Sequence, residues 1–144
     1  MTMHEARFDQ LTAHTLYTLL KLRTDVFVVE QNCPYPELDG RDDEPGTIHL
    51  WIAERETPLA YLRLLTDPDG SRRIGRVVTA PRARGRGLAA DLVRAALDRT
   101  AGAPCVLDAQ SHLVAFYERF GFVKSGPEYV EDGIPHVPMR REAA

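Results

Sequence analysis

The chain has 144 residues, of which 44% are hydrophobic and 27% are charged, and its formal net charge is −3. This composition is typical of a globular protein with a buried core, and the length fits a single domain spanning residues 1–144. The small negative charge gives no general reason to expect nucleic acid as a partner. Cys33 and Cys105 lie far apart, which argues against a disulfide framework or a zinc site. No secretory signal or membrane span is visible, so we expect a reduced, cytoplasmic protein with no membrane partner.

The first third of the chain predicts a strand, a helix and a long loop. Residues 6–11 suggest a short strand, and Thr12 or Thr15 can cap the helix that follows. A run of β-branched residues predicts a break in this helix near Asp25. Residues 32–47 combine prolines, glycines and acids, which indicates a long loop, and such loops are more often functional than idle. One face of the expected helix is formed by Leu16, Leu19, Leu20, Arg23 and Phe27.

The middle of the chain predicts a sheet with one crossover helix. Residues 48–55, 58–67 and 71–80 have the composition of strands joined by short turns, which predicts an antiparallel meander. An amphipathic helix over residues 87–100 then leads to a short buried strand at residues 104–110. A strand–helix–strand unit of this kind is parallel. We therefore expect an α/β fold, with a mixed, mostly antiparallel sheet around a central βαβ unit.

The last part of the chain predicts a second helix and a hairpin. The helix begins near Ser111 and ends at Gly121, and the hairpin turns at Asp132 and Gly133. Prolines at positions 135 and 138 weaken the final strand, because proline cannot donate to a β-ladder. They argue for an edge strand or a splayed strand.

Positive charge and backbone freedom are concentrated at the junction before the amphipathic helix. Arg82, Arg84 and Arg86 alternate there with Gly85 and Gly87. A helix N-terminus presents unpaired N–H groups, and glycines let a ligand approach the backbone, so the junction is suited to bind a pyrophosphate. A solvated basic turn before an ordinary helix is the alternative. The spacing matches neither a P-loop nor a GxGxxG dinucleotide site.

Four blocks of the sequence together resemble the GNAT acetyltransferase family. Arg82-x-x-Gly85-x-Gly87 after a valine-rich strand is similar to the acyl-CoA signature of that family, and residues 115–122, AFYERFGF, are similar to its second motif. Residues 20–40 and 129–141 resemble the ElaA-like branch. The blocks occur in the family's order and span almost the whole chain. The resemblance implies the GNAT acyl-CoA N-acyltransferase fold, with helices on both faces of the sheet.

The resemblance also implies acetyl-CoA as co-substrate. We expect no metal, because the acidic run lacks the spacing of an EF-hand. Arg82 and Arg84 would lie near the phosphates, and Gln110 would offer an amide where many family members have asparagine. The pantetheine arm would run along Val77, Val78 and Thr79, and Phe116 and Tyr117 would complete the cofactor site. The pyrophosphate would be bound by the backbone amides of Arg84, Gly85, Arg86, Gly87, Leu88 and Ala89.

The implied chemistry is direct attack of an amine on the thioester. The Val78 N–H would stabilise the oxyanion, and Tyr117 would act as general acid toward the leaving thiolate, although helical spacing alone would place Tyr117 in the core. Glu30, His112 and His136 are the candidates for the general base. Capping roles are the alternatives for Glu30 and His112.

The acceptor is expected to be a small-molecule or peptide amine, bound by Glu30, Cys33, Asp39, His112 and His136. Asp39 belongs to an acidic stretch over residues 37–44, which we interpret mainly as a solvated loop and otherwise as a device that attracts a cationic acceptor. Cys33 can instead be a packing thiol, and Trp51 a core residue or a dimer contact. The family leaves a homodimer open. An acyl-CoA-binding or sensing module with little turnover is the second hypothesis.

Overall fold

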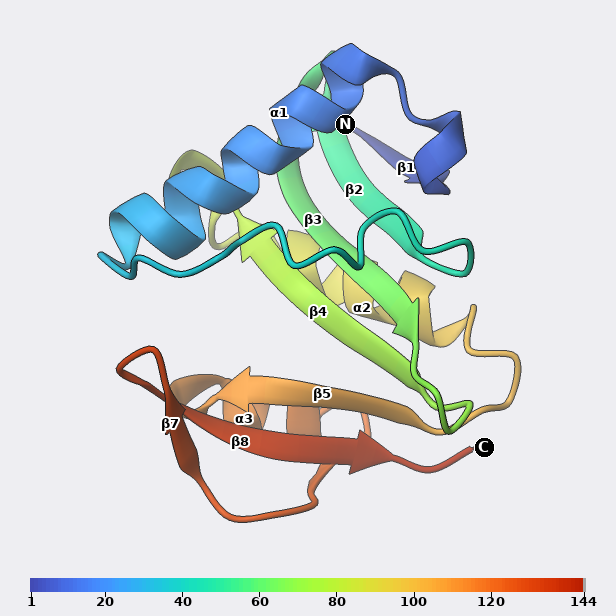
Figure 1. Ribbon diagram of the computed structural model, residues 1–144, viewed down its shortest axis with the longest axis vertical. Helices are drawn as coiled ribbons and strands as arrows, with labels where there is room; N and C mark the ends of the chain where they lie inside the picture. The colour runs from blue at the N-terminus through green and yellow to red at the C-terminus, as the bar shows by residue number, and fades with distance from the viewer. Residues whose placement is uncertain (144) are drawn as a thin grey trace.

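The computed structural model describes residues 1–143. The strands of this part form one sheet in the order β1-β2-β3-β4-β5-β8-β6, with β7 paired to β8 (Figure 1). The strands are β1 (Thr2–Ala6), β2 (Ile48–Glu54), β3 (Thr57–Thr66), β4 (Arg72–Thr79), β5 (Cys105–Gln110), β6 (Val123–Lys124), β7 (Tyr129–Glu131) and β8 (Ile134–Arg141). The helices are α1 (Ala13–Thr24), α2 (Leu88–Leu97) and α3 (Val114–Glu118), with a π-helical turn at Asp25–Glu30 and 3₁₀ turns at Phe8–Gln10, Pro81–Ala83 and Ser111–Leu113.

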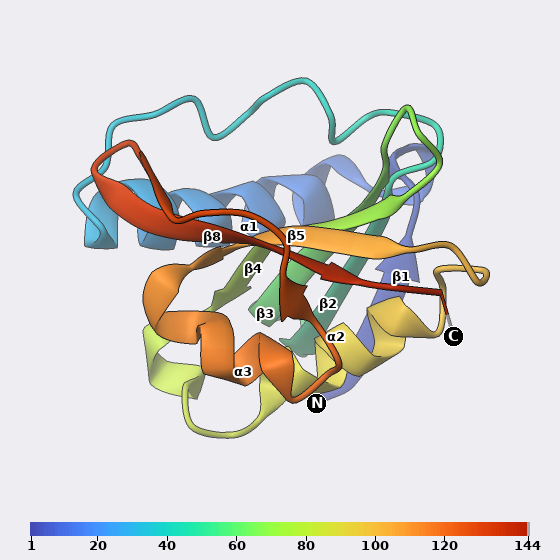
Figure 2. The same ribbon diagram turned by 90° about the horizontal axis from the view of Figure 1, so that it is seen from below.

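Helices cover both faces of the sheet, as the resemblance implied. Helix α1 and the long loop lie on one face, and α2 and α3 lie on the other (Figure 2). Strand β3 contacts both α1 and α2, and all its residues from Pro58 to Leu65 are buried. Burying each large apolar side chain contributes roughly 1.5–3 kcal/mol, so β3 forms the centre of the core. No helix within residues 1–143 is both long and apolar enough to span a bilayer.

The central βαβ unit is parallel, as expected, but its two strands stay together only at one end. Strand β4 pairs with β5 at Arg72–Cys105 and Arg73–Val106, with no further pair along the two strands. Figure 1 shows the two strands diverging from there toward their carboxyl ends. An opening of this kind at the carboxyl ends of parallel strands is a common place for a ligand.

The first helix confirms two expectations. Thr12 caps α1, because its hydroxyl accepts a hydrogen bond from the Thr15 N–H at 3.0 Å. The break near Asp25 is the π-helical turn, in which three of six residues are β-branched valines that fit poorly in a regular helix. Arg23 lies on the buried face, as the periodicity predicted.

The structure corrects the expected strand at residues 6–11. The first strand ends at Ala6, and residues 8–10 form a 3₁₀ turn. Strand β1 pairs with β2, and the His4 ring stacks on Trp51 with centroids 5.3 Å apart. Trp51 is buried by this contact, which supports its role as a core residue.

The last strand is longer and more central than its prolines suggested. Strand β8 lies between β5 and β6, so it is not an edge strand. The Pro138 carbonyl accepts a hydrogen bond from the Ser125 N–H at 2.8 Å. In an antiparallel strand the nitrogen and carbonyl of one residue point to the same side, so the Pro138 nitrogen faces the β6 side and not β5. Pro135 lies beyond His136, the last β8 residue paired with β5. Neither proline therefore removes a donor from the β5–β8 ladder.

Candidate active site

The arginine–glycine turn leaves a series of backbone amides free. Gly85 and Gly87 have φ of +83° and +75°, which glycine adopts without strain. Gly87 is the N-cap of α2, and its carbonyl accepts the first helical hydrogen bond, from Asp91 at 3.1 Å. Within residues 1–143, the amides of residues 85–90 have no backbone acceptor. The Arg84 N–H, which we expected at the pyrophosphate, instead donates to the Pro81 carbonyl at 3.4 Å. A Cβ added at either glycine would meet no atom within 4 Å, so the space before these amides is open. The turn therefore fits a pyrophosphate.

The three arginines of the turn differ in what they contact. Arg84 forms a bidentate pair with Glu30, with nitrogen–oxygen distances of 2.7 and 2.8 Å. Hydrogen bonding from Arg84 lowers the pKa of Glu30, which makes this carboxylate a weaker base than we expected. Arg82 and Arg86 are exposed, like Arg84, and Arg86 Nη2 donates to the Arg82 carbonyl at 3.4 Å.

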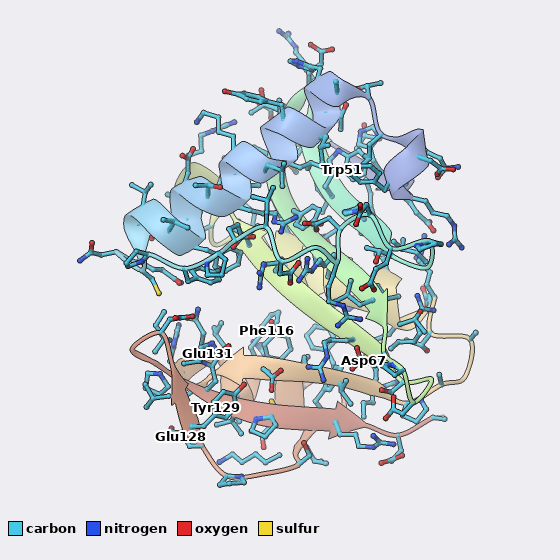
Figure 3. The ribbon with its side chains drawn as sticks, viewed as in Figure 1. Trp51, Asp67, Phe116, Glu128, Tyr129 and Glu131 are labelled. Atoms are coloured by element: carbon cyan, nitrogen blue, oxygen red, sulfur yellow. The ribbon has the colours of Figure 1, made fainter. Side chains whose placement is uncertain are left out.

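A cavity of about 590 Å³ occupies the opening between β4 and β5. A second cavity of about 190 Å³ adjoins it at the turn and includes Gly85, Gly87 and Leu88. The two share Thr79, Arg84, Ala89 and Phe116 in their walls, and Figure 3 shows Phe116 in the opening between the strands. Of the predicted site residues, the larger cavity is lined by Glu30, Cys33, Val77, Val78, Thr79, Arg84, Ala89, Gln110, His112, Phe116, Tyr117 and His136.

The pairing of β4 with β3 bears on the choice of oxyanion donor. The Ala80 N–H donates to a β3 carbonyl at 2.8 Å, and Val78, two residues earlier in the same register, lies opposite Tyr61. Amides along an antiparallel strand alternate in direction, so the Val78 N–H faces β3. From the pairing of Val78 we infer that the amides of Val77 and Thr79 face the opening, where both residues line the larger cavity.

Tyr117 is a buried residue whose side chain lines the larger cavity. The residue is 5% exposed, and its ring packs edge-to-face against Phe116 and Phe122, with centroids 5.0 and 6.1 Å away. Burial raises the pKa of Tyr117 to about 12, so the phenol stays protonated across the neutral range. Its hydroxyl has no hydrogen-bond partner among the described residues, which leaves it free to donate to a ligand.

The far end of the cavity is formed by the β7–β8 hairpin and the segment after the π-helical turn. His136 Nδ1 lies 2.8 Å from the Ile134 carbonyl, which can only accept, so Nδ1 carries the proton and Nε2 can accept one. The Cys33 thiol donates to the Asp132 carbonyl at 3.2 Å, and burial raises the pKa of Cys33. Cys33 therefore connects the loop to the hairpin as a neutral thiol. His112 lines the cavity but is exposed.

Asp39 is the one predicted acceptor residue that lies outside both cavities. It pairs with Arg63 and Arg76, and although burial opposes ionisation, the hydrogen bonds from Arg63 hold the pKa of Asp39 far below its usual range. Glu37 is buried against Arg23 at 2.7 Å, so this end of the acidic stretch is not solvated. Glu37, Asp39, Asp42 and Glu44 all pair with arginines of the same chain, whereas Asp43 is exposed.

Several residues that line the larger cavity carry no signal in the sequence. Asp108 lies two residues before Gln110 on β5 and pairs with Arg73 at 2.7 Å. Nothing near Asp108 in the sequence indicates this contact. For Arg76 the sequence does contain a local sign, because the Gly75-Arg76 pair interrupts the apolar pattern of β4. Figure 3 shows Glu131 and Tyr129 on the hairpin side of the opening. The missed polar lining residues are Gln31, Tyr35, Arg76, Asp108, Glu131 and Asp132.

The fold and this site define a class of protein. The sequence pattern of the acetyltransferase (GNAT) domain matches residues 25–143. The chain therefore belongs to the GNAT family of acetyltransferases, and it is an acyltransferase.

Within this class the chain is similar to the ElaA and UPF0039 proteins. It is 40% identical to protein ElaA of Escherichia coli over 140 residues, which cover 93% of this chain and 92% of ElaA. A UPF0039 protein of Mycobacterium tuberculosis is 51% identical over 138 residues, covering 91% of this chain and 86% of that protein. An acyl-CoA N-acyltransferase of Pseudomonas aeruginosa has a structure that matches with a TM-score of 0.92 at 47% identity, covering 97% of this chain and 98% of that one. These relatives confirm the ElaA-like resemblance.

Proposed function

We propose that the chain transfers an acetyl group from acetyl-CoA to a primary amine by direct attack within a ternary complex. One observation carries the proposal: an unbroken path leads from the free amides of residues 85–90, along Val77 and Thr79, to the Tyr117 hydroxyl and the hairpin. The relative from Pseudomonas aeruginosa is an acyl-CoA N-acyltransferase, which agrees with this chemistry.

The turn and β4 would bind the coenzyme. The free amides at the start of α2 and the partial positive charge of that helix would hold the pyrophosphate, with Arg82 and Arg84 adding charge. Val77 and Thr79 would pair with the pantetheine arm as a further strand would, because their amides face the opening. Gln110, whose Nε2 donates to Gln31 at 3.4 Å, would present its amide at the acyl end.

The reaction needs a proton acceptor, an oxyanion donor and a proton donor. His136 Nε2, directly or through water, would take the proton that the attacking nitrogen loses as its bond to the acyl carbon forms. The Val77 N–H would donate to the carbonyl oxygen as it becomes negative. Tyr117 would donate to the sulfur as the carbon–sulfur bond breaks. Burial raises the pKa of Tyr117 to about 12, so the phenol would still carry its proton when the thiolate forms.

Thiol release from acetyl-CoA with pooled primary amines tests the proposal. Tyr117→Phe should lower kcat about 100-fold or more, because it removes the proton donor, while CoA binding by calorimetry stays unchanged. Tyr17→Phe makes the same chemical change at an exposed position on α1 and should be silent. Tight acyl-CoA binding without release against any amine would instead support a binding or sensing module.

A further inference from the structure

Strand β4 contains an irregularity at the point where it leaves β5. Its register with β3 shifts by one residue between Gly75 and Val78, so Arg76 and Val77 together oppose a single β3 residue. Arg76 has φ of +53°, in the left-handed region that side chains rarely adopt. Such a bulge bends its strand, and this one follows closely on Arg73, the last β4 residue paired with β5. The bulge therefore helps to set the opening between the strands.

An arginine in a conformation that favours glycine needs its surroundings to hold it there. The Arg76 guanidinium lies 5.5 Å from the centre of the Tyr35 ring, and its Nη2 donates to the Glu37 carbonyl at 3.0 Å. Its Nε lies 2.9 Å from Glu37 Oε2, without the alignment of a hydrogen bond, so this contact is an ion pair. Asp39 lies 3.5 Å from Nη2. Residues 35–39 thus hold Arg76 from several directions.

These anchors are themselves fixed to the core. The Glu37 side chain is 3% exposed and also pairs with Arg23 on α1 at 2.7 Å. Arg23 in turn pairs with Asp42 at 2.7 Å. The Arg76 side chain therefore contacts a network of ion pairs that reaches the core, and its own backbone directly precedes the Val77 amide.

We propose that Arg76 is a positioning residue for acyl transfer. Its guanidinium, held by Glu37, Asp39 and Tyr35, fixes the left-handed bulge that directs the Val77 N–H toward the acyl carbonyl. The inference rests on the proposed function, because it gives that amide its role. It adds that the long acidic loop acts on the reaction through the backbone of β4, without touching the acyl group.

Two variants separate positioning from simple folding. Arg76→Gly adopts the observed φ without strain but loses every anchor, so the bulge can form and is no longer fixed. Arg76→Lys keeps a charge near Glu37 and should recover part of the function. Arg41→Ala is the matched control, since Arg41 ties the same loop to Asp67 at 3.1 Å, away from the bulge. Circular dichroism confirms that each variant is folded before it is assayed.

Two readouts test the positioning role directly. In ¹⁵N-labelled wild-type protein, acetyl-CoA should shift the Val77 amide signal beyond the shift that CoA alone produces, and Arg76→Gly should lose this difference. In thiol release, Arg76→Gly should lower kcat at least 10-fold with the Kd for CoA within about twofold of wild type, because a misaligned donor affects the transition state most. Arg41→Ala should retain wild-type kcat.

Each negative outcome counts against either the role of Arg76 or the proposed function. Wild-type kcat in Arg76→Gly, an unchanged Val77 response in that variant, or an equal loss in Arg41→Ala would overturn the role of Arg76 while leaving the proposed function intact. Failure of the wild-type chain to bind CoA at all would overturn the proposed function itself.

Discussion

Replacing Gly85 by alanine tests whether the turn before α2 is the anion site. Gly85 has φ of +83°, and a Cβ built there meets no atom within 4 Å. Gly70, in the turn between β3 and β4, has φ of +88° and is equally open. It lines neither cavity. The two glycines are therefore matched in backbone strain and in space, and they differ in their relation to the proposed pyrophosphate site.

The size of each effect follows from this geometry. Alanine in the left-handed region costs about 1–2 kcal/mol, so Gly85→Ala and Gly70→Ala should lower the free energy of unfolding by similar amounts. At position 85 the new methyl group also occupies the open space before the amides. Loss of one hydrogen bond to a charged phosphate costs about 1.5–3 kcal/mol. Since 1.4 kcal/mol is a factor of ten, Gly85→Ala should bind CoA roughly 10- to 100-fold more weakly.

Urea unfolding and calorimetric titration with CoA measure the two quantities on the same samples. The expected result is similar stability for the two variants, with weakened CoA binding confined to Gly85→Ala. If both variants bind CoA within about twofold of each other, the turn does not approach the phosphates, and our placement of the coenzyme is refuted.

Three further predictions follow from the ion pairs and the buried tyrosine. Arg23→Met leaves Glu37 buried without its α1 partner and should lower the free energy of unfolding by about 3–5 kcal/mol in urea; adding Glu37→Gln should recover part of this, and strictly additive losses would contradict the pairing. Burial raises the pKa of Tyr117 to about 12 from its ordinary value near 10, so the unfolded chain ionises first as pH rises. Between pH 9 and pH 11 the wild type should therefore lose about 1 kcal/mol more stability in urea unfolding than Tyr117→Phe, and equal losses would show that the hydroxyl is solvated. Glu30→Gln releases Arg84 for phosphate, so CoA should bind more tightly in calorimetry; unchanged or weaker affinity would mean that Arg84 does not reach the ligand.

Features whose cause is local in the sequence could be predicted. Glycines at positions 85 and 87, followed by an apolar 3.6-residue pattern, predicted the turn and α2, because both depend on residues within one helical turn. The hairpin at Asp132 and Gly133 was predicted for the same reason, and both residues have positive φ as a tight two-residue turn requires. The parallel β4–β5 pair followed from the order of elements alone.

Features that depend on distant contacts could not be predicted. The acids of residues 37–42 have the composition of a solvated loop, and nothing near them in the sequence indicates Arg63 or Arg76 as partners. The choice between Val77 and Val78 as oxyanion donor depends on distant contacts for a related reason. Which amides of β4 face the opening depends on its register with β3, and the register shift between Gly75 and Val78 is visible only in the pairing of the strands.

The buried ion network is better understood as a geometric device than as a source of stability. Removing Arg23 and Glu37 from water carries a large desolvation cost, which their mutual attraction offsets only in part, so apolar residues could serve the core as well. What apolar residues could not do is hold residues 35–39 at a fixed direction from β4, since hydrophobic contacts are not directional. Arg76 uses that fixed direction, because its guanidinium meets Glu37 and Asp39 while its backbone forms the bulge beside Val77. An apolar replacement of the network that preserves stability should therefore still lower kcat, and full activity in such a variant would show that the loop only needs to be present, not aligned.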